Sequence, residues 1–194
     1  MNKDIQRILF SESQIKEKVV QAAAWLDRRY AGKNPLFISV LKGSVMFFCD
    51  LVRAMETPVQ MDFMMVSSYG SGTESSGIPK IVMDLAEDVT GRDVVLVEDI
   101  VDSGHTLQRM QSLMAGRGAA SFTTVALFDK PVRRKVDVKA DYSCFEVGDE
   151  FIVGYGLDYA QQYRNLPYVG ILKREVYEKN KTDALGIALC PPRL

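Results

Sequence analysis

The chain has 194 residues, and its 24 Lys and Arg residues nearly balance its 25 Asp and Glu residues, which gives a formal net charge of -1. This length fits a single domain over residues 1–194, and the balanced charge excludes an overall positive field that would hold nucleic acid or an anionic membrane. No stretch reaches the ~20 apolar residues of a membrane span, and the N-terminal segment is too polar for a signal peptide. We therefore expect a soluble cytoplasmic protein.

The first predicted element is a helix over residues 11–30, with Ser11 as its N-cap. The apolar positions that define its buried face are Ile15, Val19, Val20, Ala23 and Leu26. Residues 35–43 predict a buried strand, which is followed by a second helix. The apolar positions of this second helix are Val45, Phe48, Cys49 and Val52.

Residues 59–69 predict another strand, and the segment from Ser68 to Gly77, rich in Gly and Ser, predicts a mobile loop. The apolar run at 94–100 is typical of a central parallel strand that is covered on both faces. A helix follows it, with Leu107, Met110, Leu113 and Met114 on its apolar face. Further strands are expected at 122–130 and 151–158. Strands that alternate with helices predict an open α/β sheet, whose ligands bind at the carboxyl ends of the strands.

The cysteines indicate free thiols. Cys49, Cys144 and Cys190 are far apart, odd in number and without the spacing of metal ligands, so we expect buried, reduced side chains rather than disulfides. His105 is the only histidine, which excludes a metal site built from several histidines.

The stretch VVLVEDIVDSGHT, from Val94 to Thr106, carries the strongest functional signal. Its turn lies between a strand and a helix, where the amide groups of a helix N-terminus bind anions. It lacks both the Gly-Lys-Ser/Thr ending of a nucleotide-triphosphatase loop and the three spaced glycines of a dinucleotide-binding turn. Three acids beside an anion-binding turn suit an activated sugar phosphate, whose hydroxyls and Mg²⁺ ion the acids would bind.

VVLVEDIVDSGHTL resembles the phosphoribosyl-pyrophosphate motif of the purine phosphoribosyltransferases, specifically their hypoxanthine-guanine branch. Three further segments resemble the same branch in the same order: LKGS at 41–44, FDKPVRRK at 128–135 and FIVGYGLDYAQQYRNLPYVG at 151–170. The resemblance covers most of the chain from about Ile38 to Lys173. It implies the type I phosphoribosyltransferase fold, an open, mostly parallel twisted sheet flanked by helices, with a small hood region.

The resemblance also implies which residues bind phosphoribosyl pyrophosphate. The turn from Asp102 to Thr106 would hold the 5′-phosphate, and the segment at Lys42 would meet pyrophosphate after a peptide bond, Leu41–Lys42, that is often cis in this family. The residues with an implied role toward this substrate are Lys42, Gly43, Ser68, Tyr69, Glu98, Asp99, Asp102, Ser103, Gly104, His105, Thr106 and Arg164. Of these, Ser68 and Tyr69 begin the loop that would close over the reaction.

A second implied group binds the purine and the metal. Lys130 would donate to the 6-oxo group, Phe151 would stack on the ring, and Ile152 would offer main-chain groups to the base edge. Asp158 would lie near the base and hold Mg²⁺ with pyrophosphate, and Glu98 and Asp99 would share the metal. Asp102 would also exchange a proton with N7 of the purine, which makes it the expected catalytic residue.

Simpler roles remain open for several of these residues. Asp99 or Asp102 fits a helix N-cap, and Lys130 with its basic neighbours fits a solvated turn. His105 is expected to contribute mainly its main-chain N–H, with a partly exposed side chain, and Tyr155 is expected in the core.

Two alternative functions also remain. One is a phosphoribosyltransferase that prefers xanthine, and the other is a regulatory protein that keeps the fold without catalysis. Since the chain has no added DNA-binding segment and no excess of positive charge, we expect a Mg²⁺-dependent enzyme that acts on small molecules and binds neither nucleic acid nor membrane. The family makes a homodimer or homotetramer the expected assembly.

Overall fold

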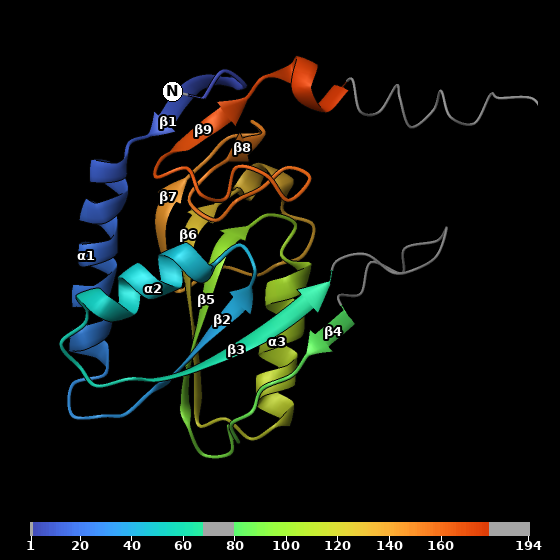
Figure 1. Ribbon diagram of the computed structural model, residues 1–194. Helices are drawn as coiled ribbons and strands as arrows, with labels where there is room; N and C mark the ends of the chain where they lie inside the picture. The colour runs from blue at the N-terminus through green and yellow to red at the C-terminus, as the bar shows by residue number, and fades with distance from the viewer. Residues whose placement is uncertain (1, 68–79, 179–194) are drawn as a thin grey trace, which may run out of the picture.

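The computed structural model describes residues 2–67 and 80–178, which form two β-sheets with helices packed against the larger one (Figure 1). The larger sheet has six strands in the order β4-β3-β2-β5-β6-β7, and the smaller sheet has three in the order β1-β9-β8. This arrangement confirms the predicted α/β class. In chain order, the elements are β1 (Ile5–Phe10), α1 (Glu12–Arg29), β2 (Leu36–Leu41), α2 (Val45–Ala54), β3 (Gln60–Ser67), β4 (Lys80–Met83), β5 (Asp93–Val101), α3 (His105–Gly116), β6 (Ser121–Asp129), η1 (Pro131–Arg133), β7 (Tyr142–Glu146), β8 (Ile152–Val153) and β9 (Val169–Leu172).

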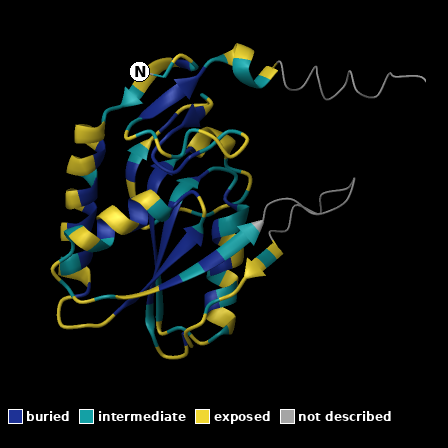
Figure 2. Cartoon of the chain, in the orientation of Figure 1, coloured by how far each residue is buried: buried dark blue, intermediate teal, exposed yellow. Residues whose placement is uncertain are grey.

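Strand β5 lies at the centre of the larger sheet. It pairs in parallel with β2 and β6, β3 and β7 extend the parallel part, and β4 adds an antiparallel edge. Val94 and Leu96 belong to the apolar cluster that contains α3, whereas Val95 and Val97 belong to the cluster that contains α1 and α2. All four are fully buried, and Figure 2 shows the central strands in dark blue. The apolar run predicted as a doubly covered strand is confirmed.

Helix α1 begins where the sequence predicts. The Ser11 side chain accepts a hydrogen bond from the Gln14 N–H, and the Gln14 side chain accepts one from the Ser11 N–H, so the N-cap is confirmed. One residue of the predicted apolar face is wrong: Val20 is 53% exposed, and Ala22 is buried instead. The face that packs against α2 and β7 is the one with Ile15, Val19, Ala22, Ala23 and Leu26, and Val20 lies beyond its edge. Within the described ranges, no helix is long and apolar enough to cross a membrane.

The smaller sheet was only partly predicted. In it, β1 and β8 both pair antiparallel with β9, and only Ile152 and Val153 of the predicted strand 151–158 are extended in a ladder. Gly154 and Gly156 have φ values of 107° and 100°, so the chain turns after two residues and the prediction of a longer strand was wrong. This small sheet forms the hood region that the resemblance implies.

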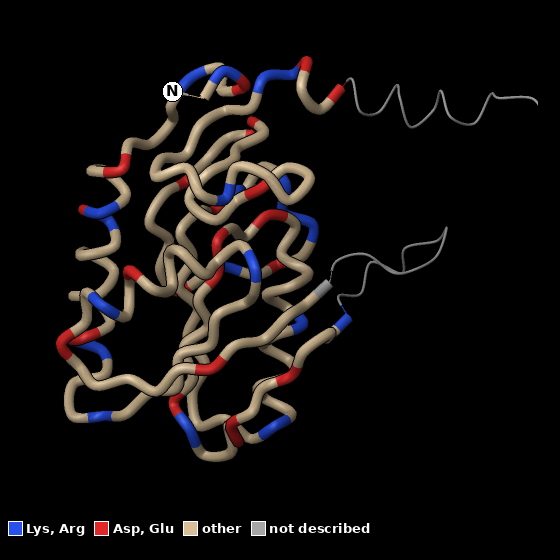
Figure 3. The backbone as a smooth tube through the Cα atoms, in the orientation of Figure 1, with Lys and Arg blue, Asp and Glu red and all other residues tan. Residues whose placement is uncertain are grey.

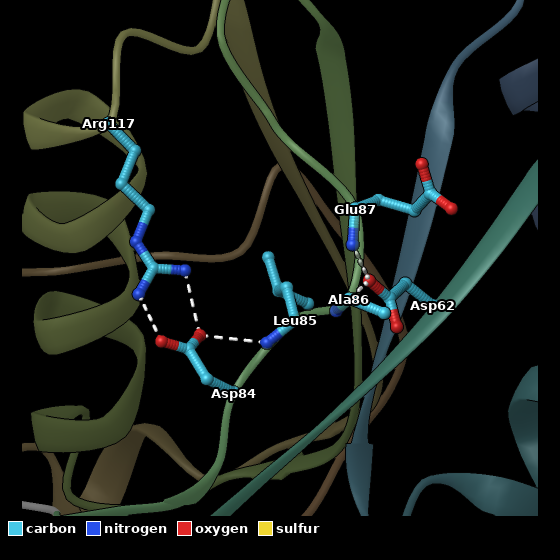
Figure 4. Close-up of polar contacts among 6 residues, drawn as sticks. All are labelled: Asp62, Asp84, Leu85, Ala86, Glu87 and Arg117. Carbon is cyan, nitrogen blue, oxygen red and sulfur yellow. Dashed lines mark hydrogen bonds and ion pairs between the residues drawn. The ribbon is translucent and has the colours of Figure 1, made fainter.

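The chain that returns from β4 is anchored on two sides (Figure 4). On one side, Asp62 of β3 accepts hydrogen bonds from the main-chain N–H groups of Ala86 and Glu87, each at 2.9 Å. On the other side, Asp84 forms a two-pronged ion pair with Arg117, the C-cap residue of α3, at 2.7 and 2.5 Å. These contacts anchor the connection between β4 and β5 to β3 on one side and to α3 on the other. The predicted loop from Ser68 to Gly77 itself lies outside the described residues.

Candidate active site

A cavity of about 520 Å³ lies at the carboxyl ends of β2 and β5. Acidic and basic segments meet there, in the region around the upper end of β5 in Figure 3. The predicted site residues that line this cavity are Lys42, Gly43, Glu98, Asp99, Asp102, Ser103, Gly104, Thr106, Asp158 and Arg164. They come from three separate stretches of sequence, which the parallel sheet brings to one edge.

The turn between β5 and α3 has the backbone of an anion site. Gly104 is the N-cap residue of α3 and has a φ of 88°, and a Cβ atom there would lie 2.7 Å from a methyl carbon of Val138. Only glycine meets both conditions. Ser103 and Thr106 flank the turn in the cavity, and the His105 side chain is half-buried, as expected. The first amide groups of α3 have no partners within the helix, so they are available to an anion.

Glu98 and Asp99 place two carboxyl groups at the end of β5, where Glu98 is buried and Asp99 is half-buried. Burial raises the pKa of Glu98 well above its usual value, and the nearby charge of Asp99 raises it further. Burial also raises the pKa of Asp99 to about 6, although hydrogen bonds from main-chain N–H groups and the charge of Arg164 oppose the change. Glu98 Oε1 is buried and has no hydrogen-bond partner among the described residues. A buried oxygen without a partner is costly, which points to a ligand that supplies one.

Gly43 brings main chain against one of these acids. A Cβ atom at Gly43 would lie 1.6 Å from Asp99 Oδ2, so any side chain there would displace the carboxylate. The peptide bond one residue earlier, Leu41–Lys42, is cis, as the resemblance implies. Lys42 Nζ donates to Gln161 Oε1 at 3.4 Å, which links the segment after β2 to the loop that follows β8.

The side chain of Asp102 lies half-buried at the cavity. Its Oδ1 is buried without a hydrogen-bond partner in the described part of the chain, and its Oδ2 lies 3.9 Å from an Arg133 nitrogen. Because Gly104 is the N-cap of α3 and makes no side-chain cap, neither Asp102 nor Asp99 serves as the cap. The carboxylate is therefore free of a structural role in the helix and faces the space where a ligand would lie.

Arg134 is a site residue that the sequence reasoning missed. Its Nη1 donates to the main-chain oxygens of Val101 and Asp102, at 3.1 and 2.8 Å, and its Nη2 pairs with Asp129. The side chain is only 15% exposed. It therefore holds the backbone from which the Asp102 carboxylate projects. The sequence offered no signal for this role, because the run RRK looks like any solvated basic turn.

Lys130 is not part of a solvated turn. It is 5% exposed, and its Nζ donates to the main-chain oxygen of Glu150 at 2.8 Å. Burial lowers the pKa of Lys130, and the charge of Asp102 partly opposes that change. Thus an ammonium group and a carboxylate influence each other electrostatically at one side of the cavity.

Phe151 and Ile152 lie beyond the cavity wall. The Phe151 side chain is partly exposed in a neighbouring groove, and its ring stacks on Tyr177 with centroids 5.0 Å apart. Ile152 pairs with Ile171 in the small sheet and buries its side chain in the main core. Lys130, Phe151 and Ile152 therefore do not line the cavity that contains the acids, although Lys130 is held by the residue next to Phe151. Ser68 and Tyr69 lie outside the described residues.

Asp158 and Arg164 form a pair on the loop after β8. An Arg164 nitrogen lies 2.7 Å from Asp158 Oδ1, and another donates to the Gly156 oxygen at 2.6 Å. Asp158 Oδ2 accepts from the Gln161 N–H at 2.8 Å. The Arg164 Nε is buried with no partner among the residues described. Both side chains reach the cavity, and one donor remains available to an anionic ligand.

The acids of the cavity suit a hard cation, because carboxylate oxygens are the ligands that Mg²⁺ prefers. Glu98, Asp99 and Asp158 line the same space, but residues 2–67 and 80–178 contain no group of three such side chains close enough to hold a metal ion together. The arrangement fits an ion that takes one or two protein oxygens and completes its shell with ligand oxygens and water.

Comparison with known proteins gives a consistent result. The family described as Phosphoribosyl transferase domain matches residues 8–160. A hypoxanthine-guanine phosphoribosyltransferase from Streptococcus thermophilus is 51% identical over 179 residues, which cover 92% of this chain and 99% of that protein. Among solved structures, a hypoxanthine phosphoribosyltransferase from Staphylococcus aureus has a TM-score of 0.85 and 44% identity, and covers 90% of this chain and 95% of its own. The corresponding enzyme of Trypanosoma cruzi has a TM-score of 0.88 and 38% identity, with 94% and 98% covered.

Proposed function

The chain belongs to the phosphoribosyl transferase family, and from this membership we propose that it is an enzyme of purine salvage. It transfers the 5-phosphoribosyl group of phosphoribosyl pyrophosphate to hypoxanthine or guanine and releases pyrophosphate with IMP or GMP. The names of its relatives support these bases over xanthine and support catalysis over a regulatory role.

The observation that supports this function is one cavity that combines an anion-binding turn with an acidic strand end. The turn at Gly104 offers amide groups to a phosphate, while the buried Glu98 and the half-buried Asp99 lie at the preceding strand end. A ribose 5-phosphate needs both, since its phosphate is an anion and its hydroxyls donate hydrogen bonds. The orphaned Glu98 Oε1 supports this role, because a ribose hydroxyl would satisfy it.

The reaction replaces pyrophosphate with a purine nitrogen at the anomeric carbon of the ribose. Positive charge develops on that carbon as the bond to pyrophosphate lengthens, and the carboxylates around the cavity stabilise it. Asp102 takes the proton that the purine loses at N7, and Arg134 keeps the Asp102 backbone in place for this transfer. Lys42 and Arg164 bind the oxygens of the departing pyrophosphate.

Glu98, Asp99 and Asp158 would hold Mg²⁺ together with oxygens of the substrate and water. When bound, the ion would neutralise part of the negative charge that leaves with pyrophosphate. Removal of divalent ions with excess chelator should abolish turnover, and added Mg²⁺ should restore it. Full turnover in a preparation freed of metal and held in chelator would contradict this assignment.

Lys130 selects the base. Its ammonium has only donors, so it matches the 6-oxo acceptor of hypoxanthine and guanine and opposes the 6-amino group of adenine. The burial of Lys130 supports this role, because two donors that face each other in a partly desolvated site cost binding free energy. The adenine penalty should be on the order of 10³-fold in kcat/KM.

The test compares kcat/KM for hypoxanthine, guanine, xanthine and adenine with saturating phosphoribosyl pyrophosphate. The parent protein should use the 6-oxopurines and reject adenine, and Lys130→Met should lose most of the discrimination between hypoxanthine and adenine. Lys33→Met is a matched control, since Lys33 pairs with Asp93 at the amino end of β5. A kcat/KM for adenine within tenfold of that for hypoxanthine in the parent protein would contradict the proposed specificity. If Lys130→Met discriminates between the two bases as well as the parent does, Lys130 does not determine the specificity.

The remaining parts of the proposal concern the state of the protein in the cell. We place it in the cytoplasm, where its purine and phosphoribosyl substrates are small soluble molecules, and we expect a homodimer or homotetramer. Light scattering at several protein concentrations would measure the assembly, and a monomer at all concentrations would contradict it.

A further inference from the structure

The aromatic ring of Phe151 has a second aromatic ring against it. The Tyr177 ring stacks on it with centroids 5.0 Å apart and planes 21° from parallel. Tyr159 meets Phe151 edge-on at 5.6 Å, and its ring lies 6.5 Å from that of Tyr177. The side chain proposed to stack on the purine therefore belongs to a group of three rings. Such pairs are worth more than the area they bury, so the contact restrains the plane of Phe151.

The fold ties Tyr177 to the same support as Phe151. The Leu172 N–H donates to the Phe151 main-chain oxygen at 2.8 Å, which joins β9 to the residue that precedes β8. Directly after β9, a helical turn at 174–178 brings Val176 and Tyr177 onto an apolar cluster that includes Val153 and Leu172. Hence Tyr177 and Phe151 are both anchored to one small sheet.

The stack leaves room for a ligand. Although Tyr177 covers part of it, Phe151 keeps 39% of its surface exposed. The preceding residue, Glu150, offers the oxygen that holds Lys130 Nζ, so the aromatic plane and the ammonium group are fixed one residue apart. A base that accepts a hydrogen bond from Lys130 would therefore lie near the residue that precedes Phe151. A half-exposed ring with no neighbour against it would lose rotational freedom when the base binds. A ring that is already restrained loses less conformational entropy on binding.

We propose that Tyr177 is a positioning residue for base recognition, which stacks on one face of Phe151 and holds the other face ready for the 6-oxopurine. This role rests on the proposed function of Phe151 as the base-stacking residue. It extends base recognition to the turn after β9, which the resemblance does not assign to the site.

The experiment measures KM for hypoxanthine, KM for phosphoribosyl pyrophosphate and kcat in Tyr177→Leu, Tyr177→Phe and the control Tyr168→Leu. Tyr168 is a half-buried tyrosine of the same apolar cluster whose hydroxyl accepts a hydrogen bond from the Asn2 N–H. Tyr177→Leu should raise KM for hypoxanthine about fivefold, with kcat and the other KM within about twofold of the parent. Tyr177→Phe should restore the parent value, and Tyr168→Leu should not change it. Tyr177→Met serves the same purpose if Tyr177→Leu is poorly folded.

Three results would overturn the proposal. An unchanged KM for hypoxanthine in Tyr177→Leu would show that the stack gives no support, and a lowered KM would show that Tyr177 occupies the place of the base. An equal rise in Tyr168→Leu would show a general effect of the cluster. Phe151→Leu separates this inference from the proposed function: if that variant binds hypoxanthine normally, the stacking role of Phe151 itself fails. If Phe151→Leu raises KM, Tyr177→Leu added to it should have little further effect.

Discussion

Replacing Gly43 with Ala tests whether the acid pair at the end of β5 depends on the close approach of main chain. The new Cβ would lie 1.6 Å from Asp99 Oδ2 and 2.6 Å from its Cγ. Carbon and oxygen atoms need a separation of about 3.5 Å, so the carboxylate must move by roughly 2 Å. A displacement of about 1 Å in an active site can cost on the order of 10²-fold in rate. We therefore expect kcat/KM for phosphoribosyl pyrophosphate to fall by about 10²-fold or more.

The same structure provides a matched control. Gly116, the last residue of α3, would gain a Cβ with no atom within 4 Å, and the helical position should make Gly116→Ala neutral or more stable by up to about 1 kcal/mol. Initial rates at varied phosphoribosyl pyrophosphate, together with thermal unfolding of both variants, measure the two effects. Because Gly43 is also expected to meet pyrophosphate, Gly43→Ala should be repeated in an Asp99→Asn background, where it should cost much less. A Gly43→Ala enzyme with kcat/KM within threefold of the parent would refute the steric reasoning.

Three other predictions concern separate parts of the molecule. Asp102→Asn should lower kcat by about 10²-fold while KM for phosphoribosyl pyrophosphate changes little, because Asn keeps the shape of the side chain but cannot accept the proton. A kcat near that of the parent at saturating substrates would contradict the role of Asp102 as general base. Asp62→Ala should lower the free energy of unfolding in urea by about 2 kcal/mol, because the amides that Asp62 binds lose their acceptor, and a change under about 0.5 kcal/mol would argue against the anchor. Iodoacetamide at pH 8 should modify the exposed Cys49 at least about 100-fold faster than Cys144, whose pKa burial raises to about 12; comparable rates by peptide mass spectrometry would contradict the buried state of Cys144.

The larger sheet was predictable because its strands carry a strong signal. The run Val94–Val97 has no polar residue, which fits only a strand covered on both faces, and the acids that follow mark its carboxyl end. The first helix was predictable for a similar reason, since its cap and its apolar period agree. Its one error, Val20, arose because a period of 3.6 residues leaves the edge of an apolar stripe undefined.

The short strands were not predictable. Strand β4 has one half-buried residue between exposed ones, and β1 exposes three of its six, so neither shows an alternating pattern. Partner strands that are distant in the chain determine their conformation.

The expectation of buried thiols was correct for Cys144 and wrong for Cys49, which lies exposed on α2.

For the site, local sequence predicted the anion turn and the acids but not the surroundings of the basic residues. Lys130 and Arg134 have sequence neighbours like those of any exposed basic turn. In the structure Lys130 is buried and Arg134 is mostly shielded, and both donate to main-chain oxygens of residues at least 20 positions away. Only the resemblance assigned a role to Lys130. The stack of Tyr177 on Phe151 had no sequence signal, because it depends on how β9 pairs with β8.

The pairing of β1 with β9 sets an order on the formation of the protein during synthesis. Ile5 lies opposite Leu172, so β1 leaves the ribosome long before its partner β9 is made. The strand pairing of the larger sheet needs nothing beyond β7, and the phosphate turn and the apolar cluster that contains α3 can form while β9 is still being made. The cluster that contains α1 and α2 is completed later, because it includes Val169 and Ile171 of β9. Long-range pairing of this kind is slow, because the conformational entropy of closing a long loop is lost before the strands form any stabilising contact. The nascent chain should therefore acquire a place for the sugar phosphate well before it acquires a place for the base.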